Sequence, residues 1–93
     1  MNKIDTFKSI TNEMEQLYIL KNKNYGNSFS EQFAEYGLTS LCIRLDDKIR
    51  RLKSINKQIL NGSVNVDDES VRDTLIDLAN YSVLGIIELD TNE

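Results

Sequence analysis

Hydrophobic residues recur every three or four positions along most of this 93-residue chain, which is the spacing of amphipathic helices. The first helix is predicted from about Lys3 to Lys21, on Ile4, Phe7, Ile10, Met14, Leu17 and Tyr18. Residues 22–28 lack this periodicity, and their glycine and asparagines favour a turn. Ser28 or Ser30 is then expected to cap a short helix that ends at Gly37.

The same spacing predicts two more long helices. One runs from about Thr39 to Leu60, with apolar positions Leu41, Leu45, Ile49, Leu52, Ile55 and Ile59, and stops at Asn61-Gly62. Asp67 or Asp68 is expected to cap the last helix, which runs to about Leu89. Its predicted core face is Val71, Leu75, Leu78, Ala79, Ser82, Ile86 and Leu89. We therefore expect one all-α domain over residues 1–93, a bundle of three long helices and one short helix.

Composition narrows the range of possible chemistry. The chain has no histidine, which excludes Ser-His and Cys-His catalysis and a His-ligated zinc site. A net charge of −4 argues against a protein that coats nucleic acid through bulk positive charge. Cys42, in an apolar stretch, is expected to be a buried thiol rather than a nucleophile. No apolar run suggests a signal peptide or membrane span, so we expect a cytoplasmic protein of a cellular host or of its virus.

Charged residues form a second stripe on the predicted third helix. Arg44, Asp47, Lys48 and Arg51 follow one another at spacings of three and four, which places them along one side. The simpler interpretation is a solvated face with helical ion pairs, each worth roughly 0.3–0.5 kcal/mol.

Acidic residues on the last helix are harder to explain as a solvated face. Glu69, Asp73 and Asp77 are four residues apart, and Asn80 and Tyr81 extend the strip by one turn. Carboxylates at this spacing repel one another unless a cation relieves them. Hard cations such as Mg²⁺ take oxygen ligands and often bridge to substrate phosphates. The strip therefore indicates either a metal site or a charged border beside an ordinary dimer contact.

Three motifs, KNKNYGNSF, RLDDKIRRL and ESVRDTLIDLANY, resemble those of the phage and bacterial family called nucleotide modification associated domain 1. The resemblance covers about Leu20 to Leu84. That family is similar to the MazG-like all-α enzymes, which use Mg²⁺ to split nucleoside triphosphates into monophosphate and pyrophosphate. The chain departs from the pattern in two places. Asn24 replaces a common aspartate, and the paired acids are incomplete because Asp73 and Asp77 are four apart rather than three.

The resemblance implies a set of site residues. Asp47, Asp73 and Asp77 would be the catalytic acids, and together with Glu69 they would hold Mg²⁺. The residues implied in nucleotide binding are Lys21, Lys23, Tyr25, Ser28, Arg44, Lys48, Arg51, Asn80 and Tyr81. The lysines and the serine hydroxyl can meet phosphate, and a tyrosine ring can stack on a base.

Three functions stay open on the sequence. The first is Mg²⁺-dependent hydrolysis of a nucleoside triphosphate in phage nucleotide metabolism or modification. The second is a non-catalytic sponge that sequesters a nucleotide immune signal, linear or cyclic, as an anti-defence protein. The third is a bundle that docks a partner protein and has no nucleotide affinity. The first two require a small-molecule nucleotide as partner. We also expect a homo-oligomer, because the chain carries more apolar strips than one small domain can bury.

Overall fold

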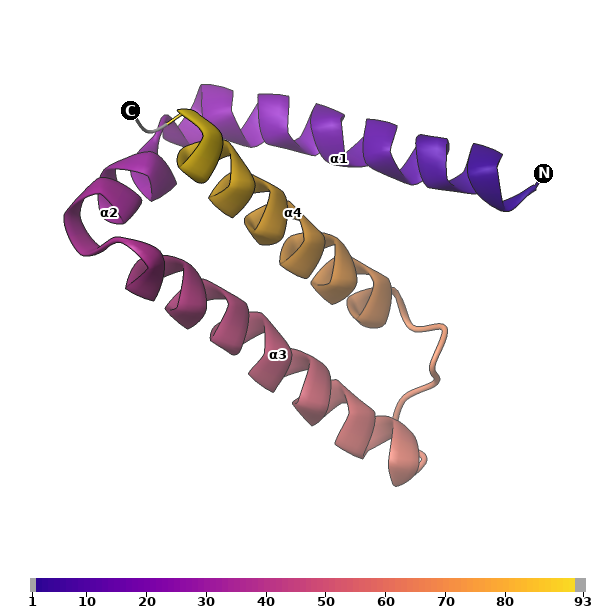
Figure 1. The fold of residues 1–93 in the computed structure, drawn as a ribbon. Coiled ribbons are helices and arrows are strands. Elements are labelled where there is room, and N and C mark those ends of the chain that lie inside the picture. Colours follow the sequence, from indigo (N-terminus) through magenta and orange to yellow (C-terminus); the bar gives the residue numbers. More distant parts are fainter. Residues whose placement is uncertain (1, 92–93) are drawn as a thin grey trace.

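The computed structural model describes residues 2–91, except for the side chain of Tyr25, and these residues contain four helices and no strand (Figure 1). The helices are α1 (Lys3–Tyr25), α2 (Ser28–Tyr36), α3 (Leu38–Leu60) and α4 (Glu69–Thr91). The predicted all-α fold of three long helices and one short helix is confirmed. Within residues 2–91, no helix has the length and apolarity that a bilayer crossing demands.

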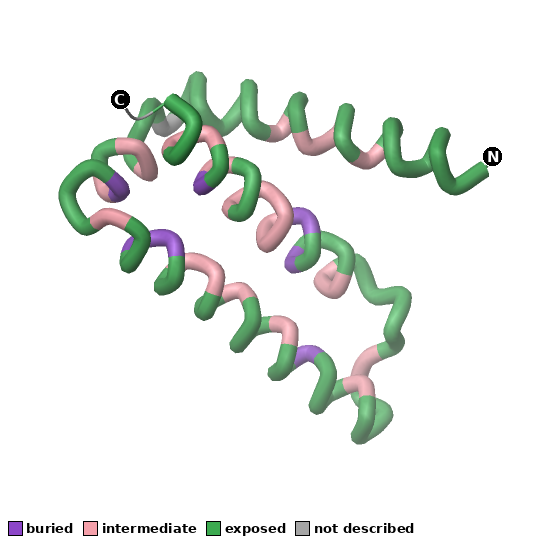
Figure 2. The backbone as a smooth tube through the Cα atoms, in the orientation of Figure 1, coloured by how far each residue is buried: buried purple, intermediate pink, exposed green. Residues whose placement is uncertain are grey.

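The antiparallel pair of α3 and α4 forms the main packing contact of the chain (Figure 1). Buried positions lie where these helices face each other, and Thr74 of α4 is only 1% exposed (Figure 2). Gly85 of α4 lies against Leu41 of α3, because the absence of a side chain lets the two helices approach closely. Leu41 and Ile55 are buried and Leu45, Leu52 and Ile59 are half-buried, which confirms most of the predicted core face of α3.

Helix α1 lies across α4 and is attached by few contacts. The Arg72 guanidinium donates to the Glu13 carboxylate over 2.7 and 2.9 Å. Within residues 2–12, no side chain forms a hydrogen bond or ion pair with another helix. The N-terminal part of α1 therefore extends away from the other helices, and Ile4 and Phe7 are exposed (Figures 1 and 2).

The helix ends correct several predicted details. Helix α1 continues to Tyr25 rather than ending at Lys21, and Gly26 then ends it with φ 66° and an N–H···O=C bond to Asn22. Helix α2 follows Asn27, so neither Ser28 nor Ser30 is its cap. The predicted stop of α2 at Gly37 is confirmed. Asp68, one of the two predicted caps of α4, accepts hydrogen bonds from the Ser70 N–H at 2.9 Å and from the Ser70 hydroxyl.

Two predictions about burial are wrong. Cys42 is exposed, because it follows Leu41 on the side of α3 that turns away from α4. On α4, the predicted core face is open at Leu75, Ile86 and Leu89, which are about half to two thirds exposed. The reason is that α3 covers the side of α4 that carries Gly85, and α1 covers the side that carries Asp77. The third side of α4 has no neighbour within the described chain.

Candidate functional site

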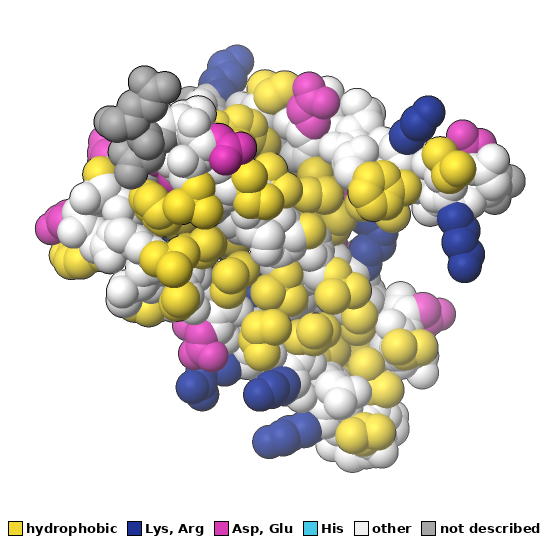
Figure 3. Space-filling view, viewed as in Figure 1, with side chains coloured by type: hydrophobic (Ala, Val, Ile, Leu, Met, Phe, Trp, Pro, Cys, Tyr) yellow, Lys and Arg dark blue, Asp and Glu magenta, His cyan; other side chains and the backbone are white. Residues whose placement is uncertain are grey.

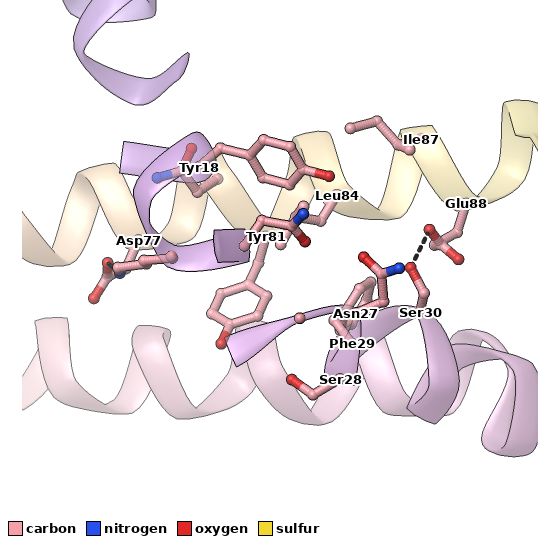
Figure 4. Close-up of a pocket in the computed structure, with 14 residues that line it drawn as sticks. Tyr18, Asn27, Ser28, Phe29, Ser30, Asp77, Tyr81, Leu84, Ile87 and Glu88 are labelled. Carbon is pink, nitrogen blue, oxygen red and sulfur yellow. Dashed lines mark hydrogen bonds and ion pairs between the residues drawn. The ribbon is translucent and has the colours of Figure 1, made fainter. Parts of the chain in front are cut away.

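A pocket of about 480 Å³ lies between the C-terminal end of α1, the start of α2 and the middle of α4 (Figure 4). It combines aromatic and aliphatic side chains with amides, hydroxyls and three charged groups. The lining residues are Tyr18, Lys21, Asn22, Gly26, Asn27, Ser28, Phe29, Ser30, Asp77, Asn80, Tyr81, Leu84, Ile87 and Glu88. Its volume falls in the range of roughly 300–1,000 Å³ that is typical of small-molecule sites.

The aromatic wall of the pocket is built around Tyr81. The Phe29 ring meets the Tyr81 ring edge-on, with centroids 5.9 Å apart, and Phe33 supports Phe29 from the buried side. The Arg44 guanidinium lies 5.8 Å from the Tyr81 ring centroid, and its Nε and Nη2 donate to the Gln32 Oε1 atom over 3.1 and 3.0 Å. Arg44 is therefore held in place from α2, and it holds the Tyr81 ring from α3.

A charged group lies at the other end of the pocket, around Asp77. Lys48 Nζ of α3 lies 3.4 Å from Asp77 Oδ2, and Lys21 Nζ of α1 lies 3.8 Å from Asp77 Oδ1. Asp77 and Lys48 are each less than a third exposed, whereas Lys21 is mostly exposed. Two ammonium groups from two other helices thus share one carboxylate on α4. Lys21, Lys48 and Asp77 together carry a net positive charge.

The first turn of α2 presents backbone donors to the pocket. The first hydrogen bond inside the turn runs from the Glu31 N–H to the Asn27 carbonyl, and the Asn27 side chain makes no capping bond. The N–H groups of Ser28, Phe29 and Ser30 therefore lack acceptors within the helix. The Ser30 hydroxyl donates to Glu88 Oε2 over 2.9 Å, which ties α2 to α4 (Figure 4). An uncapped helix N-terminus is a favourable place for an anion.

The structure brings together part of the site expected from the sequence. Lys21, Ser28, Asp77, Asn80 and Tyr81 line the pocket, and Arg44 and Lys48 contact two of them. The other expected residues do not line it: Lys23, Asp47, Arg51, Glu69 and Asp73 are exposed on the outer surfaces of their helices. The Tyr25 side chain lies outside the described part of the structure.

Sequence reasoning missed several pocket residues, among them Tyr18, Asn22, Asn27, Phe29, Ser30 and Glu88. Tyr18 fits the apolar positions of the first predicted helix and Phe29 those of the second, so the pattern does not distinguish them from core residues. Glu88 gave the clearest signal that went unused, because it is an acid between the apolar residues Ile87 and Leu89. Such a position suggests a polar partner on a neighbouring element, and Ser30 is that partner.

The acids expected to hold Mg²⁺ do not converge within one chain. Among residues 2–91, no group of three or more aspartate, glutamate, cysteine or histidine side chains lies close enough to share a metal ion. The one expected ligand in the pocket, Asp77, has two lysines beside it rather than further carboxylates. Cations already occupy the surroundings of this carboxylate, so the donor set of a single chain does not fit a divalent metal.

The shifted pKa values of carboxyl groups belong to positions outside the pocket lining. Hydrogen bonds from Arg72 hold the pKa of Glu13 below its usual value. Hydrogen bonds from the Ser70 hydroxyl and backbone N–H do the same for the pKa of Asp68. These two groups stabilise the attachment of α1 and the start of α4, respectively.

Comparison with known proteins identifies the family of the chain. No curated protein and no solved structure is similar enough to the chain to count as a match. A family model described as nucleotide modification associated domain 1 matches residues 21–89. The match includes α2, α3 and most of α4, together with the end of α1 that lines the pocket. The chain therefore belongs to the nucleotide modification associated domain 1 family.

Proposed function

We propose that this protein binds a nucleotide in the pocket between α1, α2 and α4. The observation that carries the proposal is the meeting of an aromatic wall, an uncapped helix N-terminus and a lysine in one cavity of about 480 Å³. The base would lie against Tyr81 and Tyr18, where stacking on an aromatic ring contributes about 1–3 kcal/mol. The phosphates would lie near Lys21 and the first N–H groups of α2.

Binding without turnover is the role that the charge arrangement supports best. Asp77 is engaged by Lys21 and Lys48, and these lysines favour an anion in the pocket over a divalent cation. A sponge that holds a linear or cyclic nucleotide, as in an anti-defence protein, needs only such a site. Mg²⁺-dependent hydrolysis of a nucleoside triphosphate stays a second hypothesis, supported by the run of Glu69, Asp73 and Asp77 along α4.

The test is calorimetric titration with a panel of nucleoside triphosphates and cyclic nucleotides, with and without Mg²⁺, followed by chromatography of the mixtures. We expect at least one nucleotide to bind at micromolar concentration, to need no Mg²⁺ and to be recovered intact. Mg²⁺-dependent release of pyrophosphate would instead support the enzyme. No binding across the whole panel would contradict the proposal and support a docking module.

Lys21 and Lys23 provide a matched pair of variants for this titration. Both are exposed lysines on the last turns of α1, but only Lys21 lines the pocket. Lys21→Met should weaken nucleotide binding about tenfold or more, because a hydrogen bond to a charged group contributes roughly 1.5–3 kcal/mol. Lys23→Met should bind like the wild type. Equal losses in both variants would mean that only the general charge of α1 matters, and would argue against the assigned pocket.

A further inference from the structure

The described chain leaves most of its large hydrophobic side chains outside the core. Fifteen are exposed, whereas the buried hydrophobic residues are four: Phe33, Leu41, Ile55 and Ile76. Single exposed hydrophobic residues are normal on a monomer, but contiguous exposed patches mark interaction sites. The distribution of these residues therefore matters more than their number.

Six of them lie on two neighbouring helices and form what we call the outer face. It comprises Ile4 and Phe7 on α1 and Leu75, Val83, Ile86 and Leu89 on α4. Each is between 44% and 69% exposed. Hydrophobic side chains gather over α4 and continue onto α1 in the space-filling view (Figure 3). The outer face thus joins the uncovered side of α4 to the part of α1 that extends beyond it.

The shape of the chain indicates how much surface lacks a partner. The accessible surface is 7217 Å², whereas a compact monomer of this mass exposes about 5,500 Å². The radius of gyration is 15.2 Å, whereas a compact domain of this length has about 12 Å. The excess of about 1,700 Å² is larger than the roughly 800 Å² that each partner hides in a standard interface.

The charges around the outer face suit a second copy of the same chain. Lys3 and Lys8 flank the hydrophobic residues of α1. The end of α4 instead carries the exposed Asp90, and α4 has no lysine or arginine after Arg72. A two-fold axis presents each surface to its counterpart, so one copy supplies both the basic and the acidic border.

We propose that the outer face is the interface of a homodimer, in which two copies cover each other's α1 and α4 through these six residues. The extended part of α1 is then a dimerisation arm whose hydrophobic side chains are buried by the partner. This interface does not depend on nucleotide binding, because Lys21 and the first turn of α2 lie outside it.

The proposal is tested by light scattering of the purified full chain at micromolar concentration, without nucleotide. The wild type should have twice the 10.7 kDa mass of one chain. The double variant Phe7→Glu, Ile86→Glu should have the mass of a single chain, because it places like charges in an apolar interface. Its circular dichroism should stay helical, since both side chains are already exposed in one subunit.

Ile43→Glu is the matched control. Ile43 is 58% exposed, like Phe7 and Ile86, but lies on α3 outside the outer face. This variant should keep the mass of the wild type. A monomeric wild type would overturn the proposal. So would an assembly that survives the double variant or dissociates on Ile43→Glu.

Discussion

At the residue scale, Gly85 sets the distance between α3 and α4. A methyl group at this position would lie 2.5 Å from the Leu41 Cδ2 atom, so even a small side chain requires Leu41 to shift, and a large one also requires the two helices to separate. Gly85→Leu should therefore lower the free energy of unfolding by about 1–3 kcal/mol or more, despite the higher helix propensity of leucine.

Urea denaturation followed by circular dichroism measures this loss. Ser54→Leu is the control, because Ser54 lies on α3, away from Gly85 and outside the outer face, and is exposed. That variant should change the free energy of unfolding by less than about 0.5 kcal/mol. If the two variants unfold at the same urea concentration, the close approach at Gly85 does not limit stability.

Asp77 is the second residue with an unusual setting, since two lysines flank one carboxylate at the edge of the pocket. Asp77→Asn keeps the shape of the side chain but frees the charge of Lys21 and Lys48. Nucleotide affinity should rise about three- to tenfold, because a negative charge near the bound phosphates is removed.

The same titration with and without Mg²⁺ distinguishes the two hypotheses for Asp77. If the carboxylate is a metal ligand, Asp77→Asn should abolish Mg²⁺-dependent binding or turnover instead of strengthening binding. The stability of the protein should change little in either case, because exposed and half-exposed ion pairs contribute about 1 kcal/mol or less.

At the element scale, α1 is attached to α4 by a pH-sensitive ion pair between Glu13 and Arg72. The folded pKa of Glu13 lies below its ordinary value of 4.5 because Arg72 donates hydrogen bonds to the charged carboxylate. The stability that this ion pair contributes is therefore fully present above pH 4.5 and is lost as the pH falls through the lowered pKa of Glu13. The pKa of Asp68 is shifted in the same direction, so the start of α4 weakens in the same acidic range.

Glu13→Gln isolates the contribution of this ion pair to the free energy of unfolding. The variant should be less stable than the wild type at pH 7, and the difference should shrink as the pH falls below 4.5 and Glu13 of the wild type takes up a proton. Urea denaturation at a series of pH values, from 7 down through this acidic range, makes the comparison. A difference that stays the same over the whole series would show that the side chain acts through its shape rather than its charge.

The positions of the helices were predictable from the sequence, but the packing of one helix against another was not. Periodicity located all four helices, because the spacing of apolar residues reports which face is hydrophobic. It did not report whether another helix covers that face, so Leu75, Ile86 and Leu89 were assigned to a core that the single chain does not have. The family motifs point to Lys21, Asp77 and Tyr81, whereas Tyr18 enters the pocket only through the way α1 crosses α4.

At the scale of the whole molecule, the outer face predicts that stability depends on protein concentration. If folding and association are coupled, dilution favours the unfolded monomer by mass action. A tenfold dilution should lower the melting temperature by about 4 °C, given the unfolding enthalpy of roughly 0.7 kcal/mol per residue. The double variant at Phe7 and Ile86 should melt at a temperature that dilution does not change. A wild-type melting temperature equally insensitive to dilution would argue against coupled folding and association.

The joint between α1 and α2 has a consequence for the lifetime of a bound molecule. Only Gly26 and Asn27 separate these helices, and both residues also line the pocket. These two residues form the pivot about which the 23-residue α1 can rotate away from α4. A ligand held between α1 and α4 would therefore leave when α1 rotates outward. We expect the dissociation rate to follow this rigid-body motion. Residence time would then change when the joint is stiffened, even where every contact with the ligand is kept.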